Sequence, residues 1–420
     1  MGNTRYYNDV FIPGGTPTVT YNPRRGRNLE DRVQQTKKNI CKLMIITGPT
    51  KTGKTVLVEK VFGREKPVWI EGGSICDNEE YFWENVIAQL QIASEFEEHQ
   101  SQDMDFEITA EGQLKIPFIQ TGVGVSGSVS RSHMRGQTLR SSVSNKTAAI
   151  RFLSENRIPL IVDDFHYIDR NVQTAIVRAL KAPVMHGLPV VFIAIPNRKF
   201  DVLKVEREMT GRLEIFEIPS WSLDELAMIA DTGFQELNVH IPDTLKMSLA
   251  QEALSSPHLM QEFCKAICEE QQIVKPAKER SSVDESIDLP NLFQKIARNT
   301  GRPLFEKLAR GPRQRSDRIK RRLKDGTVTD IYGAVMAAFV QMKPGMDSVN
   351  YDRFRGYLRD VLDSDLPQKN EITRVLDKLT EICYNTGAST PVIDWDSEED
   401  ILTITDSFFA FYLRWKGLTY

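Results

Sequence analysis

A strand-forming apolar run followed directly by a glycine-rich loop is the feature that most restricts the fold of this chain. Residues 43–47, Leu-Met-Ile-Ile-Thr, are apolar enough to form a buried strand. The residues that follow match the pattern G-x-x-x-x-G-K-[ST] in full. They are Gly48, Pro49, Thr50, Lys51, Thr52, Gly53, Lys54 and Thr55. A strand that runs into such a loop indicates a sheet with a phosphate site at its edge.

Each specified position of this loop has a chemical reason. The glycines allow backbone N–H groups to close around a phosphate chain, and the helix that follows adds the positive end of its dipole. Lys54 is expected to reach the outer phosphates, and the hydroxyl of Thr55 is expected to bind Mg²⁺. An ordinary glycine turn beside a lysine is the alternative, and the full match disfavours it.

The residues after the loop predict a helix over 55–62, a strand over 67–70 and a helix over 77–96. A strand and helix order of this kind predicts a parallel sheet covered by helices. The predicted fold class is α/β, a P-loop NTPase parallel sheet over 41–220, preceded by an N-terminal segment over 1–40 that leads into it.

The run Ile158–Asp164 predicts a buried strand that ends in two acids. Open α/β sheets bind ligands at the carboxyl ends of their strands, so both acids should lie beside the phosphate loop. Asp163 fits a carboxylate that shares the Mg²⁺ with Thr55, and Asp164 fits a group that orients or deprotonates an attacking water. An ordinary turn is the alternative reading of Asp-Asp.

Two further strands are predicted over 189–195 and 213–218. The first ends beside Asn197, our candidate for contact with a γ-phosphate or water, with Arg198 second. Arg207 or Arg212, near the start of the last strand, could serve a neighbouring subunit as an arginine finger. A solvated surface arginine is the alternative for each.

An insertion interrupts the predicted sheet domain. Residues 104–145 contain alternating apolar positions followed by a serine-rich, arginine-containing stretch, which indicates a β-hairpin with a basic tip. Residues 114–140 could contact DNA, a partner protein or the next subunit, or form a surface loop without specific function.

From residue 221 the pattern becomes helical, and residues 221–285 predict a helical lid whose first helix has a serine cap at Ser222. A later helix begins at Pro257 and His258, and its start could face a nucleotide. A surface histidine near a helix cap is the alternative for His258.

Residues 286–328 are expected to form a basic connector. Within 302–324, ten basic residues stand against Glu306 and Asp317. They could contact the DNA backbone, or form a solvated face. The last part, 329–420, predicts helices over 329–341, 351–362 and 368–384, a hairpin and a final helix, which together describe an α+β winged-helix domain.

Composition narrows the choices further. The net charge of the 420 residues is −3, which disfavours wholesale coating of nucleic acid. Five scattered cysteines suit a reducing compartment, and Cys264 and Cys268 lack companions for a zinc site. No apolar run is long enough for a membrane span, and the N-terminus is too polar for a signal peptide, so we expect a cytoplasmic protein without membrane contact.

With these motifs the chain resembles the AAA+/STAND branch of P-loop ATPases, and also archaeal initiator-type and transposition-regulator ATPases. The resemblance implies ATP and Mg²⁺ as ligands, with Tyr21 and Arg24 near the adenine and the lid proline Pro257 against the nucleotide. The chain departs from the common pattern at Ser256, where glycine is frequent, and at Asp164, where the AAA+ class usually has glutamate.

Three functional hypotheses follow from this resemblance. The first is an ATP-driven switch that forms homo-oligomers or signals to an effector protein. The resemblance to bacterial STAND-like ATPases adds antiviral defence as a setting for this hypothesis. The second is a DNA-binding assembly ATPase of initiator or transposition-regulator type. The third is a slow scaffold that merely holds nucleotide.

Overall fold

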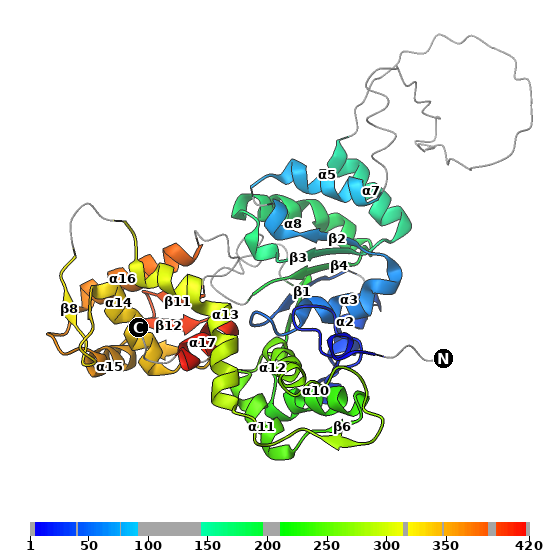
Figure 1. Cartoon of the computed structure of the whole chain (residues 1–420). Helices are drawn as coiled ribbons and strands as arrows, with labels where there is room; N and C mark the ends of the chain where they lie inside the picture. The colour runs from blue at the N-terminus through cyan, green and yellow to red at the C-terminus, as the bar shows by residue number, and fades with distance from the viewer. Residues whose placement is uncertain are drawn as a thin grey trace, which may run out of the picture.

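A computed structural model describes residues 5–38, 41–75, 77–90, 144–195, 211–313, 318–346, 348–384 and 392–416. In these residues the chain forms three parts, a sheet domain, a helical lid and a C-terminal module (Figure 1).

The sheet domain is built on five parallel strands in the order β2-β3-β4-β1-β5. The strands are β1 (Leu43–Thr47), β2 (Val68–Glu71), β3 (Leu160–Asp163), β4 (Val190–Ile193) and β5 (Leu213–Glu217). Strands β1, β3 and β4 are buried along their whole length, as expected for interior strands of a sheet with helices on both faces. The predicted α/β parallel sheet is therefore confirmed.

Successive residues of β1 pack into two separate cores. Met44 and Ile46 pack with α2 (Leu29–Lys38) and α3 (Lys54–Phe62), whereas Leu43 and Ile45 belong to the core on the opposite face. The helices of that face are α5 (Glu79–Gln89), α7 (Asn145–Asn156) and α8 (Arg170–Met185). Side chains alternate across a strand, so an unbroken apolar run is needed to fill both cores.

The lid consists of three helices and one short strand pair. The helices are α10 (Leu223–Glu236), α11 (Asp243–Glu252) and α12 (Pro257–Glu270), and β6 (Val239–His240) pairs with β7 (Ser281–Ser282). Ser222 caps α10 and exchanges hydrogen bonds with Glu225, which confirms the serine cap. The N-terminal helix α1 (Tyr7–Val10) and Phe11 pack into the lid, where the Phe11 ring lies 5.1 Å from Phe234.

Residues of the predicted connector form a long helix and a hairpin. Helix α13 (Leu289–Arg310) leaves the lid and reaches the C-terminal module, and β8 (Arg321–Arg322) pairs antiparallel with β9 (Val328–Thr329). The module then adds α14 (Ile331–Met342), α15 (Tyr351–Val361), α16 (Lys369–Tyr384) and α17 (Ser407–Trp415). Its sheet contains β10 (Val349–Asn350), β11 (Ile393–Asp396) and β12 (Ile401–Ile404), in the order β10-β12-β11. These elements fit the predicted helices and hairpin, and the winged-helix assignment itself stays a prediction.

The lid and the C-terminal module share one continuous hydrophobic core. Helices α13 and α17 lie side by side between them (Figure 1). The ring of Phe263 in α12 lies 4.9 Å from Phe293 in α13 and 5.0 Å from Phe411 in α17. The sheet domain keeps its own two cores. Packing therefore makes one body of the lid and module and a second body of the sheet domain.

We expect Gly301→Ala to lower the midpoint of thermal unfolding. A Cβ atom at Gly301 would lie 2.4 Å from the Tyr412 side chain of α17, too close for the two helices to keep their spacing. Overpacking of this kind costs about 1–3 kcal/mol, more than the ~1 kcal/mol that alanine contributes in a helix interior. Gly356→Ala in α15 is the control, because a Cβ there meets no atom within 4 Å and should raise the midpoint. Equal shifts of both variants would contradict the close approach of α13 and α17.

Candidate functional site

A cavity of about 410 Å³ lies where the phosphate loop, the N-terminal segment and the lid meet. Its volume lies in the ~300–1,000 Å³ range of ordinary ligand pockets. The carboxyl end of the sheet contributes the acidic pair, and the C-terminal module contributes Val392 and Asp406. The predicted site residues that line it are Tyr21, Arg24, Thr50, Lys51, Thr52, Gly53, Lys54, Thr55, Asp163, Asp164, Pro257 and His258.

The phosphate loop follows β1 and depends on its two glycines. Gly48 has φ +151°, and a Cβ there would lie 3.0 Å from the carbonyl oxygen of Ile218. Gly53 has φ +89°, in the region that side chains disfavour, and precedes the first residue of α3. The glycine positions of the sequence pattern therefore coincide with backbone conformations that favour glycine.

Lys54 is almost fully buried, with 8% of its surface exposed, and points back into its own loop. Its Nζ donates hydrogen bonds to the carbonyl oxygens of Gly48 at 2.9 Å and Pro49 at 2.7 Å. Burial lowers the pKa of Lys54 to about 8, against the opposing pull of Asp164 and Asp163. An anion in the cavity would offer this ammonium a stronger partner than two neutral carbonyls.

Thr55 and Asp163 meet, as the sequence predicts. The Thr55 hydroxyl donates to Oδ2 of Asp163 at 2.8 Å. Burial raises the pKa of Asp163, although the hydrogen bond from Thr55 and the backbone N–H of Asp164 oppose that rise. A hydroxyl and one carboxylate fit Mg²⁺, which takes few protein ligands and completes its shell with water and phosphate. Among the described residues no group of three or more His, Cys, Asp or Glu could hold a metal by itself.

Asp164 follows at the carboxyl end of β3 with φ +49° and lines the cavity. Burial and the neighbouring Asp163 raise its pKa to about 6, despite the attraction of Lys54. Glu71, at the end of β2 and in register with Asp163, adds a third carboxyl group that sequence reasoning missed. Burial and Asp163 raise the pKa of Glu71 as well. Its position at the end of the second apolar strand is the signal that could have identified it.

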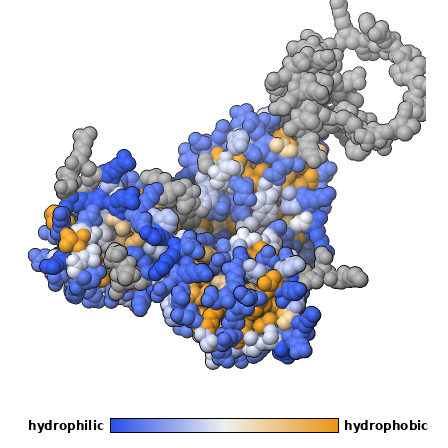
Figure 2. Space-filling model, in the orientation of Figure 1, coloured by the Kyte–Doolittle hydropathy of each residue, from blue (hydrophilic) through white to orange (hydrophobic). Residues whose placement is uncertain are grey.

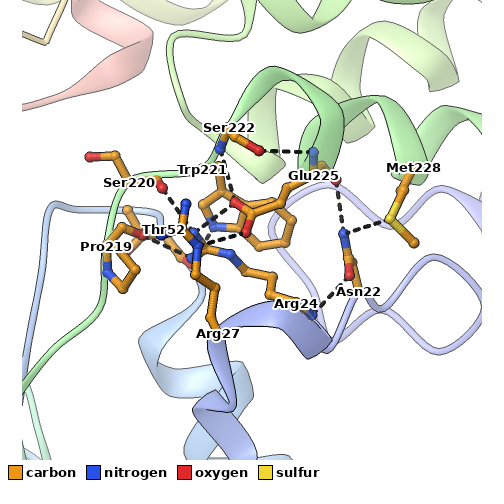
Figure 3. A network of polar contacts seen from close by, with 10 residues as sticks. All are labelled: Asn22, Arg24, Arg27, Thr52, Pro219, Ser220, Trp221, Ser222, Glu225 and Met228. Carbon is orange, nitrogen blue, oxygen red and sulfur yellow. Dashed lines mark hydrogen bonds and ion pairs between the residues drawn. The ribbon is translucent and has the colours of Figure 1, made fainter.

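Tyr21 and Arg24 line the cavity, but both polar groups are engaged elsewhere. The Tyr21 hydroxyl donates to Glu30 at 2.7 Å. The Arg24 guanidinium is directed toward residues 219–225 at the entry to the lid (Figure 3). Their predicted place near an adenine stays a prediction, and the Arg24 guanidinium contributes to the protein framework.

Pro257 and His258 both reach the cavity from the start of α12. The His258 ring lies 4.6 Å from the Phe408 ring of α17, and a Cβ at Gly14 would come within 3.1 Å of it. Burial, together with the charge of Lys51, lowers the pKa of His258 to about 4, so the ring is neutral at pH 7. His258 is therefore a packed contact among the N-terminal segment, the lid and the C-terminal module.

The C-terminal module contacts the phosphate loop directly, which the sequence did not indicate. The Thr50 hydroxyl donates to the carbonyl oxygen of Thr405 at 2.7 Å. Lys51 Nζ pairs with Oδ2 of Asp406 at 2.6 Å and lies 4.1 Å from the centre of the Phe408 ring. Residues more than 350 positions apart in the chain thus meet at the edge of the cavity.

Several predicted site residues lie away from this cavity or outside the described part of the chain. Asn197, Arg198, Arg207 and residues 104–143 of the predicted insertion belong to the latter group. Arg212 precedes β5, next to the start of β1, with its Nη1 2.9 Å from the sulfur of Met185. A strand of this length spans about 15–17 Å, so Arg212 lies at the end of the sheet opposite to the phosphate loop of the same chain. A finger role toward a neighbouring subunit stays a prediction.

Several basic side chains of residues 302–324 form ion pairs within the chain. Arg318 pairs with Asp330 at 2.5 Å, and Arg321 pairs with Glu371 at 3.6 Å. Arg302 pairs with Glu306 one helical turn away. Lys320, Arg322 and Lys324 are exposed around β8, on a module whose face in Figure 2 is mostly hydrophilic. DNA contact through this stretch stays a prediction. The ion pairs leave fewer basic side chains available for such contact than the sequence count implies.

The parallel sheet, the complete loop at the end of β1 and the acidic pair at the end of β3 define an α/β P-loop fold. A helical lid follows the sheet in the chain. Within the described residues, no helix is long and apolar enough to cross a membrane.

Comparison of structures supports this fold. The chain is similar to a Walker-type ATPase of Pyrococcus abyssi, with 13% identity and a TM-score of 0.54, over 97% of this chain and 99% of the other. Cdc6p of Pyrobaculum aerophilum aligns over 97% of both chains with 12% identity and a TM-score of 0.41. A STAND protein with a tetratricopeptide repeat sensor from Pyrococcus horikoshii aligns over 93% of this chain and 42% of its own, with 11% identity and a TM-score of 0.35. The fold assignment rests on the first of these. The sequence matches no family model and no curated protein.

We expect Asp164→Asn to stabilise the protein in metal-free buffer at pH 7.5, with a midpoint of thermal unfolding higher by about 2–4 °C. The pKa of Asp164 is about 6 in the folded chain and 3.8 ordinarily, so its ionised form opposes folding above pH 6. As the pH falls from 6 toward 4 the folded protein takes up the proton, and the advantage of the variant should shrink. Asparagine tolerates the positive φ of this position.

Asp360→Asn is the matched control for that measurement, because Asp360 is an exposed carboxylate at the end of α15. It should leave the midpoint nearly unchanged across the same pH range. A stability difference for Asp164→Asn that does not depend on pH would contradict the electrostatic account.

Proposed function

We propose that this chain is an ATP-binding and ATP-hydrolysing conformational switch of AAA+/STAND type. The observation that carries the proposal is the contact of Thr405 and Asp406 with Thr50 and Lys51 of the phosphate loop. The loop that would hold the phosphates is the same loop that holds the C-terminal module. Nucleotide binding and module position are therefore expected to influence each other.

The division into two bodies supports a switch in which the lid and module move together relative to the sheet domain. The lid and module share one core, so a ligand that moves the lid should move the module with it. The sheet domain meets that combined body through polar contacts at the loop, through the segment 218–222 and through the N-terminal segment, where Arg24 and Arg27 pair with Glu225. Polar contacts at a partly solvated boundary separate at lower cost than a common apolar core.

The residues of the site have distinct proposed roles. Lys54 would leave the carbonyls of Gly48 and Pro49 and bind the outer phosphates. Thr55 and Asp163 would hold Mg²⁺, which neutralises phosphate charge when bound. Asp164, with its raised pKa, would orient or deprotonate the attacking water, and hydrolysis would reset the switch.

The wider role is part of the proposal. Release of the module from the loop would expose surfaces for homo-oligomerisation or for an effector protein, and antiviral defence is one setting for such a switch. Arg207 or Arg212 could then act on a neighbouring subunit, with Asn197 or Arg198 near the γ-phosphate. A DNA-binding assembly ATPase remains the second candidate, because Lys320, Arg322 and Lys324 are exposed.

Lys54→Ala should weaken ATP binding at least tenfold, because it removes the one buried cation of the loop. Asp164→Asn should retain ATP affinity within a few fold and lower kcat by about 10²-fold or more. Fluorescent-nucleotide titration in the presence of Mg²⁺ and single-turnover hydrolysis measure the two effects. Wild-type affinity in Lys54→Ala would exclude the proposed site, and unchanged hydrolysis in Asp164→Asn would assign the chain to slow scaffolds.

Asp406→Asn should speed nucleotide exchange about three- to tenfold, since it removes the charge that pairs with Lys51. Asparagine can still cap α17 through the hydrogen bond from the Phe409 N–H, so the module should stay folded. Release of a fluorescent ADP, followed by stopped flow, measures the effect.

Asp400→Asn is the matched control, because Asp400 pairs with Lys369 at the same 2.6 Å distance within the module and away from the loop. Identical exchange rates for wild type and both variants would mean that the module does not restrain the phosphate loop.

A further inference from the structure

Trp221 connects the lid to the phosphate loop by a single hydrogen bond. The residue stands between the last strand of the sheet and the lid helix α10, and it is 9% exposed. Its indole Nε1 donates to the carbonyl oxygen of Thr52 at 2.9 Å. Figure 3 shows the indole beside Thr52, with Arg24 and Glu225 around it.

The geometry of the peptide bond gives this contact a consequence inside the loop. The Thr52 carbonyl and the Gly53 N–H belong to one planar trans peptide, in which C=O and N–H point in opposite directions. A carbonyl held toward Trp221 therefore turns the Gly53 N–H away from Trp221. Backbone N–H groups of this loop are the donors expected to bind phosphate. Gly53 at φ +89° has access to other conformations, so an external contact is needed to keep one of them.

Arg24 in turn fixes the segment that carries Trp221. Its guanidinium carbon lies 4.7 Å from the centre of the Trp221 ring. Nη1 donates to the carbonyl oxygen of Pro219 at 2.9 Å, and Nη2 donates to that of Ser220 at 2.8 Å. Arg24 is 4% exposed. A planar guanidinium suits this combination of two carbonyls and one aromatic face, which a lysine cannot reproduce.

Glu225 of the lid helix completes the network. Its Oε2 pairs with Nη2 of Arg24 at 2.8 Å, and its Oε1 accepts from Nε of Arg27 at 3.2 Å. Asn22 donates to the backbone carbonyl of Glu225 at 2.9 Å and accepts from the Arg24 N–H at 2.9 Å. The N-terminal segment, the entry to the lid and the phosphate loop therefore share one polar network (Figure 3).

We propose that Trp221, held in place by Arg24, is a positioning residue of the nucleotide site, which sets the Thr52–Gly53 peptide for phosphate binding and couples it to the lid. The inference rests on the proposed ATP function. Trp221 acts through the loop backbone. Its effect should therefore depend on the number of phosphates that the ligand places against the loop.

Trp221→Phe tests the proposal, because phenylalanine is smaller but keeps an aromatic face for Arg24 and lacks the indole N–H donor. ATP affinity should fall about five- to tenfold, the size expected for one lost hydrogen bond near a charged ligand. The affinity for AMP, which lacks the β- and γ-phosphates, should change less than twofold. Isothermal titration with each nucleotide measures both values.

Trp415→Phe is the matched control, because Trp415 donates the same kind of indole hydrogen bond, to Glu252 at 2.7 Å within the combined lid and module. It should leave both affinities unchanged. Arg24→Lys keeps the charge beside Glu225 but loses the pair of carbonyl contacts, so it should weaken ATP binding more than AMP binding, as Trp221→Phe does.

Equal losses of ATP and AMP affinity in Trp221→Phe would indicate a general structural role and overturn the proposal. Unchanged ATP affinity would overturn it as well. Lys54→Ala in the same titrations separates failure of this proposal from failure of the ATP function. If Lys54→Ala binds ATP weakly and Trp221→Phe binds it normally, the nucleotide site is correct and only the role of Trp221 is wrong.

Discussion

The conformation of the phosphate loop depends on hydrogen bonds that come from other parts of the chain. Residues 48–53 lie between a strand and a helix and gain little from regular backbone pairing. Trp221 binds the carbonyl of Thr52, Thr405 accepts from Thr50, and Asp406 pairs with Lys51. Each partner belongs to the combined lid and module or to the segment that leads into it. The loop is therefore one place where the two bodies of the protein meet.

The distribution of apolar contacts makes the contact between the module and the loop easier to separate than the contact between the module and the lid. Separating the lid from the C-terminal module would expose the aromatic cluster around Phe263, Phe293 and Phe411, at a cost of several kcal/mol. Separating the module from the loop costs one ion pair, one hydrogen bond and the contact of Lys51 with the Phe408 ring, each worth about 1 kcal/mol at a partly solvated surface. A ligand that binds the separated arrangement about 100-fold more tightly shifts the equilibrium by about 3 kcal/mol, enough to change the second set of contacts without breaking the first.

The sequence predicts those parts of the site whose chemistry is local. The loop from Gly48 to Thr55 and the acids after β3 follow from spacing within short segments, and the structure brings Thr55 and Asp163 together. Helix α13 was not foreseen, because Gly301 and Pro303 in its interior usually interrupt helices, yet tertiary packing against Tyr412 requires the glycine. Arg24 and Asp406 depend on partners far away in the chain, which no local pattern encodes.

The electrostatics of the cavity explain why metal and phosphate should bind together. Burial lowers the pKa of Lys54 and raises the pKa values of Asp163 and Asp164, so each group is less stable in its charged form than in water. A phosphate alone would favour charged Lys54 but repel the two carboxylates, and a cation alone would do the reverse. In a complex of Mg²⁺ with a polyphosphate, the negative oxygens would suit Lys54, and Asp163 and Thr55 would hold the metal. It would stabilise all the charges of the site at once, and for that reason we propose a magnesium-bound nucleoside triphosphate as the ligand of this site.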